Sequence, residues 1–226
     1  MVNPSHPGNV GSAARAIKTM GFSELVLVGP KFADVTSQPE AVALASGALD
    51  VLENARIYDT LEEALAPVTL AFALTARVRD LGPPPCDIRQ AADLACAHLA
   101  ETAEGCAAIV LGTERAGLTN AQIGLCHRIC HIPANPEYSS LNLAMAVQTL
   151  CYEVRMRWLE TQGTATVESD AERVDYPSAQ QLEGFYLHLE QTLQKTGFIA
   201  ADHPGQGLSK LRRLVTRPRP EVVELN

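Results

Sequence analysis

The sequence contains few aromatic residues and no long hydrophobic segment. Aromatic side chains make up 5% of the 226 residues, and tryptophan occurs once. No apolar run approaches the roughly 20 residues that a helix needs to span a bilayer. The chain also lacks the charged and then apolar opening of a secretory signal peptide. We therefore expect no membrane span and a cytoplasmic protein.

Basic residues are in the minority. There are 18 lysines and arginines against 26 acidic residues, which gives a formal net charge of −8. This balance argues against a uniformly basic nucleic-acid-binding surface but permits a local basic patch. The six cysteines lie mostly within apolar patterns, as is typical of reduced thiols in a cytosolic protein. With 46% hydrophobic residues, the chain can bury a full core.

Short apolar segments alternate with helical patterns through most of the chain. The apolar segments predict buried strands at residues 25–28, 69–74, 107–111 and 128–132. Helices are predicted between them, starting at Asn9 as N-cap, at Pro39, and at the capping boxes Thr60 with Glu63, Asp87 with Gln90 and Thr119 with Gln122. Residues 1–7 are too short and proline-rich for a complete strand, and residues 82–85 are predicted as a loop. The pattern predicts an α/β fold, a parallel sheet with helices on both faces.

Polar turns follow two of the predicted strands. Gly112–Arg115 comes directly after residues 107–111, and the loop Pro133–Pro136 follows residues 128–132. Ser139–Asn142 then opens a long amphipathic helix that we expect to reach Leu159. Ligands usually bind at the carboxyl ends of the strands in such sheets, and a helix N-terminus suits a carboxylate or phosphate. We expect a ligand site where these turns meet.

The last third of the chain changes composition. Residues 161–177 are polar and acidic and are predicted to be a linker between a domain at 1–160 and a C-terminal extension at 178–226. Ser178 with Gln181 forms another capping box and predicts a helix in that extension. The segment from 210 to 219 is the one strongly basic block in the sequence.

Three other chemistries find little support. Gly8 and Gly11 do not form a dinucleotide-binding fingerprint, and no Gly-x-Ser-x-Gly motif marks a hydrolase nucleophile. The segment from Cys126 to His131 contains two Cys-His pairs, so zinc was considered. On a strand, however, Cys130 and His131 face opposite sides, so we expect no metal site.

Three ordered motifs resemble those of the SpoU (TrmH-type) RNA 2′-O-methyltransferases of the SPOUT class. The first is Asn9–Gly21, the second is Leu111–Leu118, and the third comprises Ile132–Pro133, Ser140–Asn142 and Tyr152–Glu153. The resemblance is closest to the bacterial TrmJ branch of tRNA methyltransferases, and it includes Asn135–Tyr138 and His203–Gln206.

This resemblance implies a trefoil knot, a homodimer and a function. The expected reaction is methyl transfer from S-adenosylmethionine to a ribose 2′-hydroxyl of tRNA, at the pyrimidine at position 32 of the anticodon loop, without a metal. An rRNA ribose methyltransferase and a non-catalytic RNA-binding relative are the alternatives. The family also implies a full strand upstream of Met1 and a few residues beyond Asn226.

The resemblance assigns roles to particular residues. The implied catalytic residues are Asn9, Arg15, Glu114, Ser140 and Asn142. The implied cofactor-binding residues are Leu74, Thr75, Ala76, Gly112, Ile132, Ser140, Leu141 and Asn142. For RNA binding we expect the basic residues Lys210, Arg212, Arg213 and Arg217, continued by Arg77 and Arg79.

Taken by themselves, the same residues have simpler interpretations. Arg15 would be a solvated surface charge, Asn9 a helix cap, and Ser140 and Asn142 two further caps.

Because arginine stays protonated in proteins, we expect Arg15 to orient the ribose phosphate and to stabilise negative charge rather than to act as a base. Removal of the hydroxyl proton through Ser140, through Asn142 or through water stays open.

Overall fold

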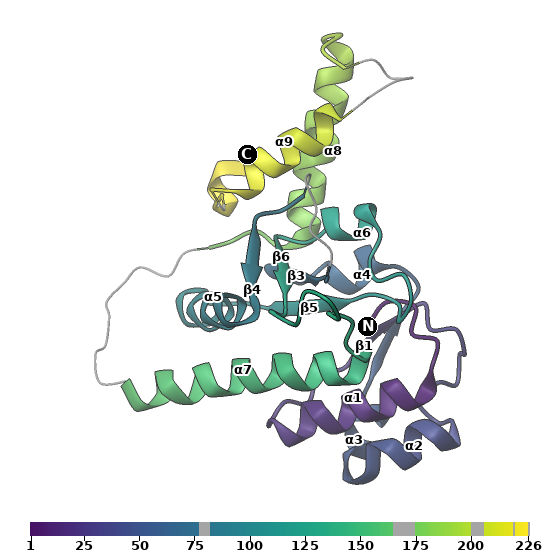
Figure 1. The fold of residues 1–226 in the computed structure, drawn as a ribbon. Coiled ribbons are helices and arrows are strands. Elements are labelled where there is room, and N and C mark those ends of the chain that lie inside the picture. The colour runs from purple at the N-terminus through teal and green to yellow at the C-terminus, as the bar shows by residue number, and fades with distance from the viewer. Residues whose placement is uncertain (77–81, 165–174, 200–205, 219, 226) are drawn as a thin grey trace.

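The computed structural model describes residues 1–76, 82–164, 175–199, 206–218 and 220–225 (Figure 1). Its strands are β1 (Val26–Val28), β2 (Arg56–Tyr58), β3 (Leu70–Leu74), β4 (Pro85–Asp87), β5 (Ala107–Leu111) and β6 (Arg128–His131). Its α-helices are α1 (Pro7–Thr19), α2 (Pro39–Ala45), α3 (Leu49–Glu53), α4 (Leu61–Leu65), α5 (Ile88–Glu101), α6 (Asn120–Gly124), α7 (Leu143–Thr164), α8 (Ala179–Lys195) and α9 (Gly207–Thr216). The short 3₁₀ helices η1 (Ser46–Ala48) and η2 (Val222–Leu225) complete the described elements.

All pairings between these strands are parallel. Four strands form one sheet in the order β4-β6-β3-β5, and β1 pairs with β2 in a second. The first residues of the chain lie between the two sheets. Val2 forms a parallel bridge with Val28, and its N–H donates to the carbonyl of Leu111 at 2.7 Å. The segment predicted to be too short for a complete strand thus connects β1 to β5 through single backbone hydrogen bonds.

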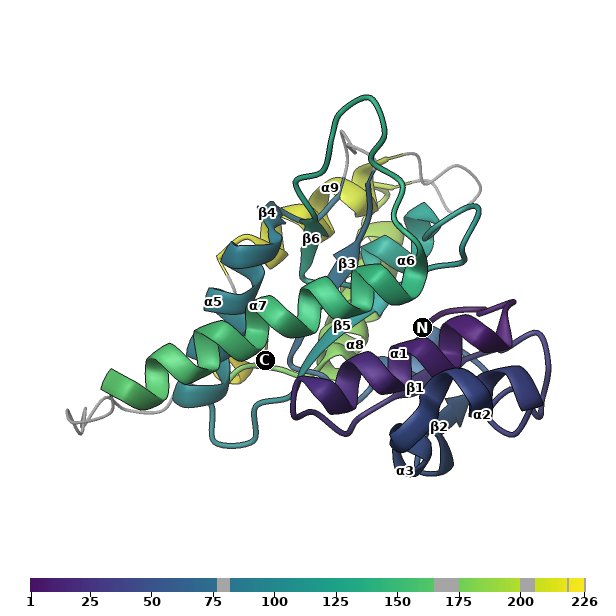
Figure 2. The same ribbon diagram turned by 60° about the horizontal axis from the view of Figure 1, so that its bottom comes forward.

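Helices cover both faces of the sheet, as predicted. Alternate residues of one strand enter different cores: Leu70 and Phe72 of β3 pack with α1, α5 and α7, whereas Ala71 and Ala73 pack with α4, α6 and α8. This alternation follows from the two-residue period of a strand. Figure 2 shows α1 and α7 side by side on one face, with α2 and α3 packed beyond α1.

The C-terminal helices lie on the other side of the sheet from α7 (Figure 1). The N–H of Ala179 at the start of α8 donates to the carbonyl of Val68 at 2.7 Å. The ring of Tyr176 lies 5.5 Å from that of His98, a fully buried side chain on α5. These contacts attach the segment before α8, and α8 itself, to the edge of the core.

Several boundaries differ from the predictions. The edge strands β2 and β4 were not predicted, and β4 includes part of the expected loop at residues 82–85. Proline is tolerated at the first position of an edge strand, which is where Pro85 lies. The helix α7 begins at Leu143 and continues to Thr164, so the first residues of the predicted linker at 161–177 are helical. Asn9 is not an N-cap, because α1 already begins at Pro7 with His6 as its cap.

Candidate functional site

A cavity opens at the carboxyl ends of β3, β5 and β6. Its volume is about 320 Å³, within the range of small-molecule sites. Its wall is built from three loops and the start of α7, and it is lined by Leu74, Thr75, Ala76, Leu111, Gly112, Thr113, Glu114, Arg115, Ala116, Gly117, Ile132, Ser139, Ser140, Leu141, Leu143 and Ala146. Every residue predicted to bind a cofactor is in this lining except Asn142. The predicted catalytic residues Glu114 and Ser140 also line it, whereas Asn9 and Arg15 do not.

The loop after β5 folds back tightly on the end of its own strand. The N–H of Gly117 donates to the carbonyl of Thr113 at 3.0 Å, and Gly117 has a φ of 67°, which favours glycine. A Cβ atom at Gly112 would lie 2.2 Å from the carbonyl carbon of Gly117. Position 112 therefore has room only for glycine, and it lines the cavity with backbone atoms alone.

Glu114 is the centre of a hydrogen-bond network at the start of α1. Its Oε2 accepts from the Ser5 hydroxyl at 2.8 Å, and its Oε1 accepts from Nδ2 of Asn9 at 3.1 Å. The backbone N–H groups of Ser5 and His6 also donate to the carboxylate, each at 3.3 Å to Oε1. A carboxylate at this position is favoured by the positive end of the helix dipole.

These contacts determine the protonation of Glu114. Burial would raise the pKa of its carboxyl, but hydrogen bonds from its own backbone, from Asn9 and from Ser5 outweigh burial and lower the pKa below its ordinary value. Glu114 is therefore a carboxylate at neutral pH, and its oxygens already accept from several donors. It is built as an anchor for the loop after β5.

Asn9 and Asn142 connect this anchor to the start of α7. Nδ2 of Asn142 donates to Oδ1 of Asn9 at 3.0 Å. Oδ1 of Asn142 accepts from the N–H of Ala144 at 2.9 Å and from that of Met145 at 3.4 Å, which is the geometry of an N-cap. Asn142 is thus both a cap, as its position suggested, and a member of the site. Residues from all three sequence motifs meet in one network.

Arg15 and Ser140 are the predicted catalytic residues outside this network. Arg15 is exposed on α1, six residues beyond Asn9, and its side chain makes no hydrogen bond or ion pair with the residues that the structure describes. Ser140 is exposed at the cavity wall. Both side chains are therefore accessible to a bound molecule.

Sequence reasoning missed Ser5 and His6. Their N–H groups and the Ser5 hydroxyl contact Glu114 from more than 100 residues away in the sequence. A local signal existed, because Ser5-His6 comes just before Pro7, and proline is favoured at the first position of a helix. Small polar residues before such a proline often serve the helix start.

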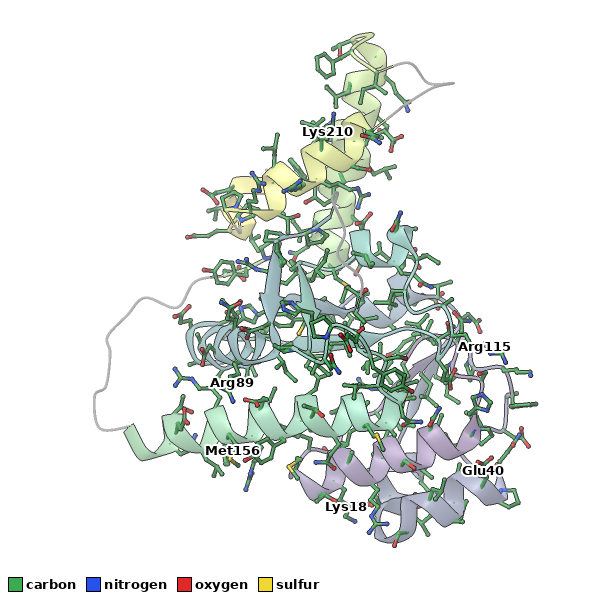
Figure 3. The ribbon with its side chains drawn as sticks, in the orientation of Figure 1. Lys18, Glu40, Arg89, Arg115, Met156 and Lys210 are labelled. Atoms are coloured by element: carbon green, nitrogen blue, oxygen red, sulfur yellow. The ribbon has the colours of Figure 1, made fainter. Side chains whose placement is uncertain are left out.

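The predicted RNA-binding residues on α9 have different surroundings. Lys210 and Arg217 are exposed, and Figure 3 shows Lys210 on the opposite side of the molecule from Lys18 and Met156. The guanidinium of Arg212 instead forms an ion pair with Glu183 of α8 and lies 4.4 Å from the ring centroid of Tyr186. Arg212 therefore holds α9 against α8. Arg77 and Arg79 lie outside the described residues.

The cysteine and histidine residues considered for zinc do not assemble. Among the residues that the structure describes, no group of three or more potential ligands lies close enough to hold a metal ion. Cys130 is fully buried and His131 is exposed, as expected for neighbours on a strand, and Nδ1 of His127 accepts from the N–H of Ala71 at 2.9 Å. In the same part of the chain, no helix is both long and apolar enough to cross a bilayer.

Comparison with known sequences identifies two family matches along the chain. The SpoU rRNA methylase family matches residues 1–152, and the C-terminal domain of the tRNA methyltransferase TrmJ matches residues 180–226. A curated tRNA (cytidine/uridine-2′-O-)-methyltransferase TrmJ from Salmonella choleraesuis is 53% identical over 226 residues, covering 100% of this chain and 90% of that protein. The TrmJ of Klebsiella pneumoniae is 52% identical over the same length, with the same coverage.

Solved structures of methyltransferases are also similar to this chain. A probable methyltransferase from Bordetella pertussis is 78% identical with a TM-score of 0.66, covering 70% of this chain and 92% of that one. TrmJ from Z. mobilis ZM4 has a TM-score of 0.80 at 33% identity, and the match covers 99% of this chain and 92% of that one.

Proposed function

Since the chain belongs to the SpoU rRNA methylase family over residues 1–152, we propose that it is an S-adenosylmethionine-dependent tRNA ribose 2′-O-methyltransferase. The observation that carries the choice of tRNA is the match of residues 180–226 to the TrmJ C-terminal domain, together with 53% identity to a TrmJ along the whole chain. The target is a cytidine or uridine, at position 32 of the anticodon loop.

The cavity fits the proposed cofactor. Its volume of about 320 Å³ and its backbone-rich wall suit a nucleoside with an attached amino acid. Gly112 lines the cavity without a side chain, so its backbone groups would contact such a molecule directly. The residues that would hold it are the strand ends Leu74–Ala76, Gly112 and Ile132, with Ser140 and Leu141 closing the wall. The cofactor supplies an activated methyl group for direct transfer to an oxygen.

The chain's own residues then position the ribose. Arg15 carries a permanent positive charge and orients the ribose phosphate while stabilising negative charge that develops on the 2′-oxygen. Alignment of the acceptor oxygen with the methyl group contributes much of the rate. Both oxygens of Glu114 and the side-chain amide oxygen Oδ1 of Asn142 already accept hydrogen bonds. Of the routes for the hydroxyl proton, the Ser140 hydroxyl and water are therefore favoured over Asn142.

The enzyme acts as a homodimer in this proposal. Three large apolar side chains lie on one exposed stripe along α7: Met145 (63% exposed), Tyr152 (49%) and Leu159 (43%). Their spacing places them on one helix face, and a face of this kind is typical of a subunit interface. A second copy is the partner, because symmetric dimers bury such a stripe against itself.

The proposed chain topology and cellular location are based on the family. The chain is proposed to form the trefoil knot of the SPOUT class around the loops after β5 and β6, and to work in the cytoplasm, where tRNA is modified. The parallel sheet and the meeting of these loops at one cavity support the knot.

The C-terminal extension contributes RNA contacts. Lys210, Arg213 and Arg217 on and after α9 provide positive charge in an acidic protein, and phosphate contacts need such a concentrated basic surface. Arg77 and Arg79, which follow β3 in the sequence, are proposed to add to these contacts. Arg212 orients α9 through Glu183, so its part in RNA binding is indirect.

Methyl transfer can be tested directly. The purified chain is incubated with bulk tRNA and S-adenosylmethionine labelled in its methyl group, and the labelled nucleotide is then mapped. We expect a 2′-O-methylated pyrimidine at position 32. Label appearing in rRNA fragments but not in tRNA would select the rRNA alternative, and no transfer to either RNA would contradict the proposal.

A further inference from the structure

The hydrogen bonds around Glu114 run in one direction only. An ionised carboxylate can accept hydrogen bonds and cannot donate them. Nδ2 of Asn9 therefore faces Glu114, and its Oδ1 must face the other way, where it accepts from Nδ2 of Asn142 at 3.0 Å. At the other end of this hydrogen-bond network, the orientation of Asn142 is determined in the same way. The backbone N–H groups of Ala144 and Met145 can only donate, and they donate to Oδ1 of Asn142.

This direction decides what the site offers to a substrate. Each amide nitrogen has two hydrogens, and the contacts above use one from Asn9 and one from Asn142. Oδ1 of Asn142 accepts from two backbone N–H groups, whereas Oδ1 of Asn9 accepts from one donor among the described residues and keeps one acceptor site. The second N–H of each amide can therefore donate to oxygens such as those of a ribose or phosphate.

Ser5 stabilises the anchor that sets this direction. Its hydroxyl donates to Oε2 of Glu114 at 2.8 Å, the shortest contact of that carboxylate, and its backbone N–H donates to both oxygens at 3.3 and 3.4 Å. The other side-chain donor, Asn9, contacts Oε1. Without the hydroxyl, no side chain among those described would hold Oε2, and the carboxylate could rotate away from Asn9.

We propose that Ser5 is a positioning residue for methyl transfer: its hydroxyl holds the Glu114 carboxylate so that Asn9 and Asn142 present amide N–H groups to the substrate. This inference rests on the proposed function. Ser5 does not itself line the cavity and, by this assignment, does not touch the reacting atoms; it acts through Glu114, which does line the cavity.

The test compares Ser5→Ala and Ser5→Thr with Ser37→Ala. Ser37 is a matched control, because its hydroxyl also makes one hydrogen bond, to the carbonyl of Asp34 at 3.0 Å, on an exposed loop. Loss of a hydrogen bond to a charged group predicts that Ser5→Ala lowers kcat roughly tenfold. The dissociation constant of S-adenosylmethionine, measured by calorimetry, should stay unchanged. Ser5→Thr should restore most of kcat, and Ser37→Ala should match the parent.

The pH profile provides a readout that a general loss of stability would not move. Hydrogen bonds to the charged form lower the pKa of Glu114, so the network is intact above that pKa and is lost as the pH falls through it. Removing the Ser5 hydroxyl raises this pKa. The acid limb of the kcat profile should therefore move to higher pH in Ser5→Ala and return in Ser5→Thr. His6, the titratable neighbour, is exposed and is common to all variants.

Glu114→Gln tests the direction of the network independently. The NH₂ group of a glutamine would face N–H or O–H groups that donate to the carboxylate in the parent, and two donors cannot form a hydrogen bond with each other. We therefore expect kcat to fall at least as far as in Ser5→Ala. Parent-like kcat in Glu114→Gln, or Ser5→Ala indistinguishable from Ser37→Ala in kcat and pH profile, would overturn the proposal. An inactive parent chain that still binds S-adenosylmethionine would contradict the proposed function instead.

Discussion

Gly112→Ala tests whether the cavity at the ends of β3, β5 and β6 binds the cofactor. The new Cβ would lie 2.2 Å from the carbonyl carbon of Gly117, 2.4 Å from its oxygen and 2.4 Å from the nitrogen of Leu118. All three atoms are backbone, so the loop itself must move. Overpacking of this kind costs about 1–3 kcal/mol. If about 2 kcal/mol of that cost falls on the bound state, the dissociation constant rises roughly 30-fold.

Thermal unfolding with and without S-adenosylmethionine measures this change. At a ligand concentration of about 100 times the parent dissociation constant, the parent gains about 2.7 kcal/mol and the variant about 0.9 kcal/mol. For a chain of this size, 1 kcal/mol shifts Tm by about 2–4 °C, so the ligand shift should fall from roughly 5–11 °C to roughly 2–4 °C.

The matched control is Gly184→Ala on α8. A Cβ there would meet nothing within 4 Å, and replacing a helix glycine by alanine should raise stability by about 0.5–1 kcal/mol. Its ligand shift should equal that of the parent. A Gly112→Ala variant that folds and binds S-adenosylmethionine with the parent affinity would refute the assignment of this cavity.

Four further predictions concern catalysis, assembly, RNA binding and the packing of α9. Arg15→Ala should lower kcat by about 10²–10³-fold, as loss of a charge-stabilising donor does, with cofactor affinity retained in calorimetry because Arg15 does not line the cavity; an equal loss of affinity would contradict the assignment. Met145→Glu should convert the dimer to a monomer in light scattering, because the side chain is 63% exposed on the α7 stripe; a parent chain that is already monomeric at micromolar concentration would refute the interface. Replacing Lys210 and Arg217 together with alanine should weaken tRNA binding and flatten its dependence on salt without changing Tm. Arg212→Ala should lower Tm through loss of the Glu183 contact. An unchanged Tm in Arg212→Ala, together with a lowered Tm in the Lys210 and Arg217 variant, would contradict both assignments.

The capping boxes were the sequence signals that predicted helix starts correctly. All four capping boxes expected from the sequence form in the structure, at Thr60, Asp87, Thr119 and Ser178. A capping box needs only residues three apart, so its energy does not depend on the rest of the chain. The strand at residues 107–111 was also predicted with its observed bounds, because it is a short apolar segment between glycines.

Short edge strands were beyond such reasoning. Strand β2 has a burial pattern of two exposed residues and one half-buried residue, so its sequence carries little hydrophobic signal. Strand β4 begins at Pro85, in a segment rich in proline. Both strands form because a neighbouring strand offers a hydrogen-bonding edge, β1 for β2 and β6 for β4. That edge exists only once the sheet has assembled.

The sequence indicated several residues that come together near the cavity, but it missed Ser5 and His6 and did not indicate which side chains are hydrogen-bonded to each other. The three motifs identified Asn9, Glu114 and Asn142, and the carboxyl ends of the strands indicated where they would meet. Local sequence reasoning predicts Asn9 to be a helix cap, whereas its amide donates to Glu114, 105 residues away. A side chain's partner across such a separation depends on the packing of α1 against the loop after β5.

The C-terminal extension shows the same limit for charge. A block of cations with no acid nearby in the sequence predicts a uniform basic surface, but Arg212 has a partner on another helix. Glu183 and the ring of Tyr186 hold its guanidinium, while the Tyr186 hydroxyl bonds with that of Thr216 at 3.0 Å. Such contacts leave Lys210 and Arg217 exposed on a helix whose orientation Arg212 has set. Neutralising the ion pair should therefore disturb RNA binding through the direction of α9, whereas neutralising the exposed residues should disturb it through charge alone, and only the second effect should fade as salt increases.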